Sequence, residues 1–74
     1  MYVYPNPSNG IITIKNMEMI TGMIEVYNLS GERITQYFFT QKESSIDMSG
    51  YKNGIYLLKV YDEKYTYTEK VTLQ

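Results

Sequence analysis

The stretch "GIYLLKVYDEKYTYTEKVTLQ" (residues 54–74) contains two strand-like segments joined by a short polar link. In the first segment, residues 54–61, apolar side chains recur at alternate positions, as they do in a strand with one buried face. The link is Asp62-Glu63-Lys64, and three residues are a usual length for a hairpin loop. We therefore predict an antiparallel hairpin, with Tyr61 and Tyr65 facing each other across its strands.

Further strand signals precede this hairpin, and turn-forming residues separate them. The predicted strands comprise residues 2–4, 11–15, 22–28, 33–39, 45–48, 54–61 and 65–73. One of the intervening turns is expected around residues 18–21. No window shows the apolar spacing of three and four residues that an amphipathic helix needs, so the sequence predicts an all-β chain of about seven short strands.

Alternation within the strands assigns the side chains to faces. The residues predicted to face the core are Ile12, Ile14, Ile24, Val26, Ile34, Phe38, Ile46, Met48, Tyr56, Leu58, Val60, Val71 and Leu73. Glu25 and Tyr27 are expected on the opposite face of their strand. Two antiparallel sheets packed face to face would bury the apolar set, which predicts an immunoglobulin-like β-sandwich. A small barrel is the alternative arrangement.

The chain has 74 residues, which is enough for a single small core, and at this size about 60% of the unfolded chain's surface is buried. The formal net charge is -1, so the sequence has no basic surface of the kind that binds nucleic acid. It contains no long apolar run typical of a transmembrane segment and no signal-peptide pattern. These features favour a small globular domain, and we interpret Met1 as a residue placed on a fragment of a longer protein.

The residue types of common active sites are scarce. The sequence contains no His and no Cys, which excludes a Ser-His-Asp triad, a Cys-His pair and the common zinc sites. The acidic residues Asp47, Asp62 and Glu63 show neither the spacing of a catalytic carboxylate pair nor that of a calcium loop. We therefore expect no catalytic residues, no cofactor and no metal ion.

Nine tyrosines are the strongest compositional indication of binding, because exposed aromatic rings stack on sugars and anchor protein partners. Tyrosine also suits half-buried strand positions, with the ring packed and the hydroxyl in water. Tyr56, which follows Gly54 at the start of a late strand, is a candidate for the tyrosine corner of Greek-key sandwiches. An extracellular module that binds carbohydrate or protein through its tyrosines is thus the alternative function.

The segment "VYPNPSNGIITI" (residues 3–14) places two prolines and a glycine directly before an apolar run. Proline has no backbone N–H and a fixed φ, so Pro5 and Pro7 end the first predicted strand. The Asn, Ser and Gly residues that follow favour a turn into the second strand.

The order of motifs along the chain resembles that of a known family. The sequence runs "VYPNPSNG" (3–10), "IEVYNLSGERI" (24–34), "IDMSGYKNGIYLLKV" (46–60) and "EKVTLQ" (69–74). These motifs, in this order, resemble the type A C-terminal sorting domain of the type IX (Por) secretion system. The resemblance covers essentially the whole chain, and Gln74 stands where many members of the family end in Lys or Arg.

The resemblance implies that residues 1–74 are a single C-terminal sorting domain excised from a larger secreted protein. Such a domain follows a cargo domain on the same chain and is recognised in the periplasm by the type IX outer-membrane translocation machinery. A sortase-like surface peptidase then removes the domain, and the cargo is attached to a lipopolysaccharide anchor at the cell surface or is secreted. The positions that match the family, and Gln74, are the recognition candidates: Tyr4, Pro5, Asn6, Pro7, Gly10, Gly31, Asp47, Gly54, Tyr56, Lys70, Val71, Leu73 and Gln74.

An address signal of this kind needs an exposed surface, and a sheet edge with unpaired N–H and C=O groups is a suitable one. We therefore expect the last strand, residues 67–74, to form the recognition surface together with loops at one end of the sandwich. Deletion of residues 71–74 should leave a cargo fusion in the periplasm.

Overall fold

The computed structural model describes residues 1–16, 18 and 21–74, and their regular structure consists of β-strands. The strands are β1 (Tyr2–Tyr4), β2 (Ile11–Lys15), β3 (Gly22–Asn28), β4 (Arg33–Phe39), β5 (Glu43–Asp47), β6 (Gly54–Tyr61) and β7 (Thr66–Leu73). The predicted all-β class and the predicted strands are confirmed, with changed boundaries in two strands, β5 and β7. The turn expected around residues 18–21 includes residues 19 and 20, which lie outside the described residues.

These changes of boundary have local causes. β5 begins at Glu43 rather than at residue 45, because Glu43 and Ser44 continue the antiparallel ladder with β2. Met48, predicted as the end of that strand, lies beyond it and donates its backbone N–H to the carbonyl of Gly10 (2.7 Å). β7 begins one residue later than predicted, because the carbonyl of Tyr65 accepts the N–H of Asp62 (3.0 Å) and closes the hairpin turn.

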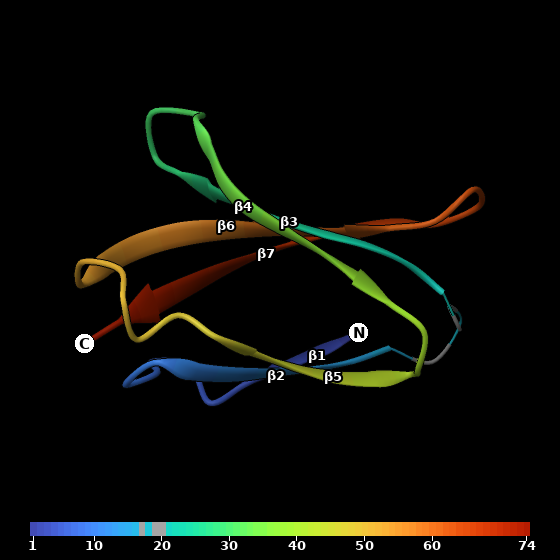
Figure 1. The fold of residues 1–74 in the computed structure, drawn as a ribbon, viewed down its shortest axis with the longest axis horizontal. Helices are drawn as coiled ribbons and strands as arrows, with labels where there is room; N and C mark the ends of the chain where they lie inside the picture. Colours follow the sequence, from blue (N-terminus) through green and yellow to red (C-terminus); the bar gives the residue numbers. More distant parts are fainter. Residues whose placement is uncertain (17, 19–20) are drawn as a thin grey trace.

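The strands form two antiparallel sheets that face each other (Figure 1). One sheet has the order β1-β2-β5, and the other has the order β4-β3-β6-β7. The predicted β-sandwich is therefore confirmed, and the hairpin β6–β7 forms one side of the larger sheet. β4 and β7 are the edges of that sheet, and β1 and β5 are the edges of the smaller one.

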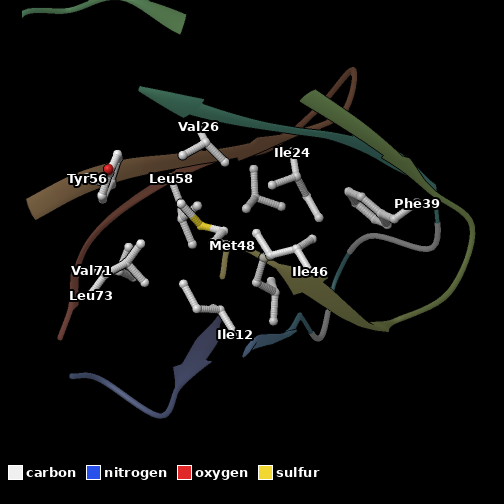
Figure 2. Packing of buried hydrophobic residues seen from close by; sticks show 12 residues of the cluster. Ile12, Ile24, Val26, Phe39, Ile46, Met48, Tyr56, Leu58, Val71 and Leu73 are labelled. Atoms are coloured by element: carbon white, nitrogen blue, oxygen red, sulfur yellow. The ribbon is translucent and has the colours of Figure 1, made fainter. Parts of the chain in front are cut away.

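The core lies between the two sheets and is apolar (Figure 2). Its buried members are Ile12, Ile14, Ile24, Val26, Phe39, Ile46, Met48, Tyr56, Leu58, Val60, Val71 and Leu73. Met48, which follows β5, is fully buried near the centre of this cluster. The alternation of side chains in β2, β3, β6 and β7 thus predicted the buried face correctly.

The prediction for β4 is wrong at Phe38, which is 68% exposed while Phe39 is buried, and it is right at Ile34, which packs against the core. A bulge in the β3–β4 ladder is the cause: Val26 lies opposite Thr35 but Tyr27 lies opposite Arg33, which leaves Ile34 as the extra residue. A bulge shifts the alternation by one position. Even-numbered side chains, which face the core at Ile34, therefore no longer face it at Phe38.

The predicted pairing of Tyr61 with Tyr65 is also wrong. Tyr61 lies opposite Thr66 in the β6–β7 ladder. Tyr65 lies before β7, and its ring stacks on that of Tyr67 with the ring centroids 6.4 Å apart. The four residues 62–65 form the loop, so Tyr65 is one residue short of the ladder.

Candidate recognition surface

The segment between β1 and β2 is a compact turn built on Ser8. The peptide bonds Tyr4–Pro5 and Asn6–Pro7 are cis. The buried Ser8 hydroxyl accepts the N–H of Gly10 (3.1 Å) and donates to the carbonyl of Ile11 (2.9 Å). The sequence prediction that β1 ends at the prolines and that a turn leads into β2 is confirmed.

Residues 6–8 of this turn, here called the strap, bind the outer edge of β7. The Asn6 side-chain amide donates to the carbonyl of Lys70 (3.0 Å), and its Oδ1 accepts the N–H of Thr72 (3.1 Å). Ser8 donates its N–H to the carbonyl of Thr72 (2.8 Å) and accepts the N–H of Gln74 with its own carbonyl (2.8 Å). Residues near the two ends of the sequence are thus joined by backbone and amide hydrogen bonds.

The strap changes the expectation that the last strand offers a free edge. The backbone groups it binds belong to residues 70, 72 and 74, and successive residues of a strand direct these groups to opposite sides. The backbone N–H and C=O groups of the even-numbered residues of β7 therefore point away from β6. The strap occupies the C-terminal part of this outer edge, and Thr66 and Thr68 lie beyond it.

Four of the predicted recognition residues lie outside the strap and have clear structural roles in the sandwich. Gly10 and Gly54 have φ of 140° and 149°, values that side chains disfavour. A Cβ atom at Gly10 would lie 3.1 Å from the Cβ of Ser49, which leaves little room for a larger residue. Gly31 has φ of 87° and donates its N–H to the carbonyl of Asn28 (3.0 Å) in the β3–β4 turn.

The fourth structural residue, Asp47, stabilises the turn after β5. Its Oδ1 accepts the N–H of Ser49 (2.9 Å). The hydroxyl and the backbone N–H of Ser49 hold the pKa of the Asp47 carboxyl below its usual value.

The predicted tyrosine corner is present. The hydroxyl of Tyr56 donates to the carbonyl of Lys52 (2.6 Å), four residues earlier in the chain, while the ring lies in the core. This hydrogen bond gives the hydroxyl of a buried tyrosine an acceptor, and it links β6 to the connection that precedes it.

The remaining recognition candidates separate into buried and exposed groups. Val71 and Leu73 belong to the core. The exposed ones among these remaining candidates lie at or beside the strap: Tyr4, Pro5, Asn6, Pro7, Lys70 and Gln74. The fold therefore brings together the two motifs at opposite ends of the sequence, and it leaves Gly31 in a separate turn.

Sequence reasoning missed a polar cluster on the outer face of the larger sheet. Glu25 was expected to point away from the core, and it does, yet only 6% of the residue is exposed. Its carboxylate accepts hydrogen bonds from Tyr27 (2.8 Å), Arg33 (3.0 Å) and Tyr61 (3.3 Å), which come from β3, β4 and β6. The local alternation shows the face but cannot show these partners, since two of them lie on other strands.

The electrostatics of this cluster follow from its contacts. The Tyr27 hydroxyl contributes most to lowering the pKa of Glu25, burial opposes it, and Arg33 and Tyr61 lower it further. The carboxylate in turn raises the pKa of Tyr27. The ammonium of Lys59 lies over the Tyr61 ring, 5.0 Å from its centroid. The cluster is thus a satisfied ion pair, and two tyrosines take part in it rather than facing a ligand.

The described residues contain no group of three or more His, Cys, Asp or Glu side chains that could hold a metal ion. Within the same residues, no helix is long and apolar enough to cross a membrane. The most exposed tyrosines, Tyr2, Tyr4 and Tyr65, lie on β1 and beside the β6–β7 hairpin. Tyr2 and Tyr4 thus belong to the smaller sheet, whereas Tyr65 belongs to the hairpin of the larger sheet and stacks on Tyr67.

The fold and the strap define a small antiparallel sandwich whose terminal motifs are joined at one edge. The family model of the secretion system C-terminal sorting domain matches residues 2–74. The chain therefore belongs to this family, and it is a C-terminal sorting signal for type IX secretion. This match confirms the resemblance found in the sequence, and a sorting domain acts as a signal rather than as a catalyst. No curated protein sequence matches the chain.

Proposed function

We propose that this domain directs a cargo domain on the same chain from the periplasm across the outer membrane, and that the surface around the strap is the part that the type IX machinery recognises. Removal of the domain by a sortase-like surface peptidase and attachment of the cargo to a lipopolysaccharide anchor complete this function. The family match supports export to the cell surface or secretion. Transit from the periplasm, recognition at the strap, removal of the domain and anchoring of the cargo are the steps that we propose.

The observation that carries the proposal is the meeting of residues 4–8 with residues 70–74. Asn6 contacts Lys70 and Thr72 across 64 and 66 residues of sequence, so the surface exists only in the folded domain. Around it lie side chains that do not contribute to the core, among them Tyr4 and Lys70. A receptor that reads this surface would distinguish a folded cargo signal from an unfolded chain.

The test is export of a reporter fused in front of residues 1–74. In a strain with the type IX machinery we expect the reporter at the cell surface or in the medium. In a strain that lacks the machinery we expect it in the periplasm. Export that does not depend on the machinery would contradict the sorting function itself.

Paired substitutions test the location of the recognition surface. Tyr4→Ala with Lys70→Ala removes two exposed side chains beside the strap and leaves its backbone hydrogen bonds in place. We expect export to fall by at least about tenfold, the effect of losing roughly 1.4 kcal/mol of binding free energy. The matched control is Lys64→Ala with Tyr65→Ala at the β6–β7 hairpin, where Figure 1 shows the opposite end of the sandwich. Equal export by both double variants would contradict the proposed surface.

A further inference from the structure

The larger sheet has one long edge that nothing in the described structure covers, the edge formed by β4. At the other edge of this sheet, the strap binds part of β7. In the smaller sheet, β1 has only three residues, and β5 has acidic residues at both ends, Glu43 and Asp47. Proteins commonly protect sheet edges by covering, shortening or charging them, and these three edges are protected in such ways.

β4 shows none of these protections after Arg33. Its sequence from Ile34 onward, "ITQYFFT" (34–40), has no charge, no proline and no glycine, and it is rich in residues that favour strands. A hollow of about 330 Å³ borders its end, between residues 37–41 and β5. Phe38, which has the most exposed large apolar side chain among the described residues, lies in the middle of this segment.

The pairing pattern shows which backbone groups of β4 are free. Lys70 and Thr72 of β7, and Gln74 after it, direct their bonded backbone groups outward, so the odd-numbered residues of β7 bond to β6. Following the ladders from β7 through β6 and β3, the odd-numbered residues of β4 bond to β3. Gln36 and Phe38 therefore direct their N–H and C=O groups away from the sheet.

We propose that a second copy of this chain pairs with β4 in antiparallel orientation, to form a dimer with one continuous eight-stranded sheet. A two-fold axis at Tyr37 places Gln36 opposite Phe38 of the second copy, and each of these pairs forms two backbone hydrogen bonds. The two Phe38 rings become diagonal neighbours on the outer face, within contact distance for aromatic side chains. The two Tyr37 side chains lie opposite each other on the inner face.

The lack of charge in this segment fits a second copy as the occupant. Like charges placed opposite each other destabilise a strand pair, and a self-paired edge necessarily places each residue near its own kind. The segment from residue 34 to residue 40 contains no charge, so self-pairing brings no like charges together. The two-fold pairing uses the β4 edge of both copies, and the strap already binds the C-terminal part of the β7 edge, so the pairing stops at a dimer rather than continuing as a fibre.

Sedimentation equilibrium of the 74-residue protein tests this proposal. The monomer mass is 8.7 kDa, and we expect the apparent mass to rise toward twice this value as the concentration increases from roughly 10 µM to 1 mM. A mass that remains at the monomer value throughout would overturn the proposal, and so would growth beyond the dimer. If the partner of β4 is instead a different protein, this sample stays monomeric. That result also overturns the proposal.

Two substitutions of matched exposure locate the interface. Phe38→Lys places like charges next to the two-fold axis, and we expect the protein to stay monomeric at the highest concentration. Leu29→Lys is the control, because Leu29 is 66% exposed, close to the 68% of Phe38, and it lies in the β3–β4 turn outside the paired segment. Dimerisation of both variants, or of neither, would overturn the assignment to β4.

A third variant tests the backbone pairing itself. Chemical synthesis of the chain with an N-methyl group on Phe38 removes one outward N–H without adding charge. We expect this variant to keep the circular dichroism spectrum of the wild type and to remain monomeric. A folded variant that still dimerises like the wild type would contradict pairing through the β4 edge.

Discussion

At the scale of single residues, Glu25 shows how a charged side chain becomes buried on the outer face of a sheet. The carboxylate would be expensive to desolvate alone, but it accepts hydrogen bonds from two tyrosines and from Arg33 at 3.0 Å. Because these donors come from three neighbouring strands, the cluster links β4, β3 and β6 on the side opposite the core. Removal of the charge should therefore affect the whole sheet.

The charge of Glu25 predicts a specific pH dependence of stability. Its folded-state pKa lies below the ordinary value of 4.5, so the ionised form stabilises the fold above pH 4.5. This stabilisation decreases as the pH falls below 4.5 and is lost below the folded-state pKa. We expect Glu25→Gln to lower the free energy of unfolding at pH 7 by about 1 to 2 kcal/mol. In acid, the free energies of unfolding of the variant and the wild type should become more alike, because the wild type also loses this charge.

Urea unfolding followed by circular dichroism between pH 7 and pH 3 measures this difference. Glu63→Gln is the matched control, because Glu63 is exposed in the β6–β7 loop. A constant difference between Glu25→Gln and the wild type across this pH range would show that the charge does not provide the stabilisation.

Single residues also show where sequence reasoning stops. Alternation correctly places Ile12 and Leu58 in the core, since both lie in regular ladders. It fails at Phe38, because a bulge at Ile34 depends on how β4 aligns with β3, and nothing in the local sequence fixes that alignment. Tyr56 was predictable because the tyrosine corner bonds only four residues back, to Lys52.

At the scale of elements, the strap determines the state of the β7 edge. The prolines indicate from sequence that β1 must end, because they cannot continue a hydrogen-bonded ladder. They do not indicate that the following residues bind a strand at the far end of the chain. The partners of Asn6 lie 64 and 66 residues away, so no local pattern contains this contact.

Asn6→Ala tests the contribution of the strap. The substitution removes the hydrogen bonds to the carbonyl of Lys70 and from the N–H of Thr72, and it leaves those of Ser8 in place. Each bond contributes about 0.5 to 1.5 kcal/mol, so the C-terminal end of β7 should open more easily. We expect hydrogen exchange at the amide of Thr72 to accelerate by roughly 5- to 150-fold, as a loss of about 1 to 3 kcal/mol implies.

Asn9→Ala is the control for this measurement, because Asn9 is an exposed residue of the same turn. Its exchange rates at Thr72 should equal those of the wild type. Equal acceleration in both variants would indicate a general loosening of the turn rather than the loss of the strap.

At the scale of the whole molecule, the sandwich could be predicted because short alternating strands with turns between them leave few ways to bury an apolar set. The division into sheets of three and four strands could not, since pairing partners such as β2 and β5 are separated by two other strands in the sequence. The recognition candidates were proposed as a surface, yet several of them build the fold. Gly54, Tyr56, Val71 and Leu73 meet along the β6–β7 ladder.

This overlap changes what a C-terminal deletion can show. Removal of residues 71–74 takes away Val71 and Leu73, which are both in the core, and the strap contacts of Thr72 and Gln74. Burial of each apolar side chain contributes about 1.5 to 3 kcal/mol. A domain of 74 residues has a total stability of roughly 4 to 11 kcal/mol. We therefore expect the truncated protein to be largely unfolded at 25 °C.

Circular dichroism and a ¹H–¹⁵N correlation spectrum test this expectation, with loss of the cooperative thermal transition and of amide dispersion as the predicted result. Gln74→Ala is the control, because it removes only an exposed side chain and keeps the backbone N–H that binds Ser8. A sharp thermal transition in the truncated protein would contradict the structural role of the last strand. If the truncated protein unfolds, its failure to be exported reports loss of the fold, and recognition can be assigned only from substitutions that keep the domain folded.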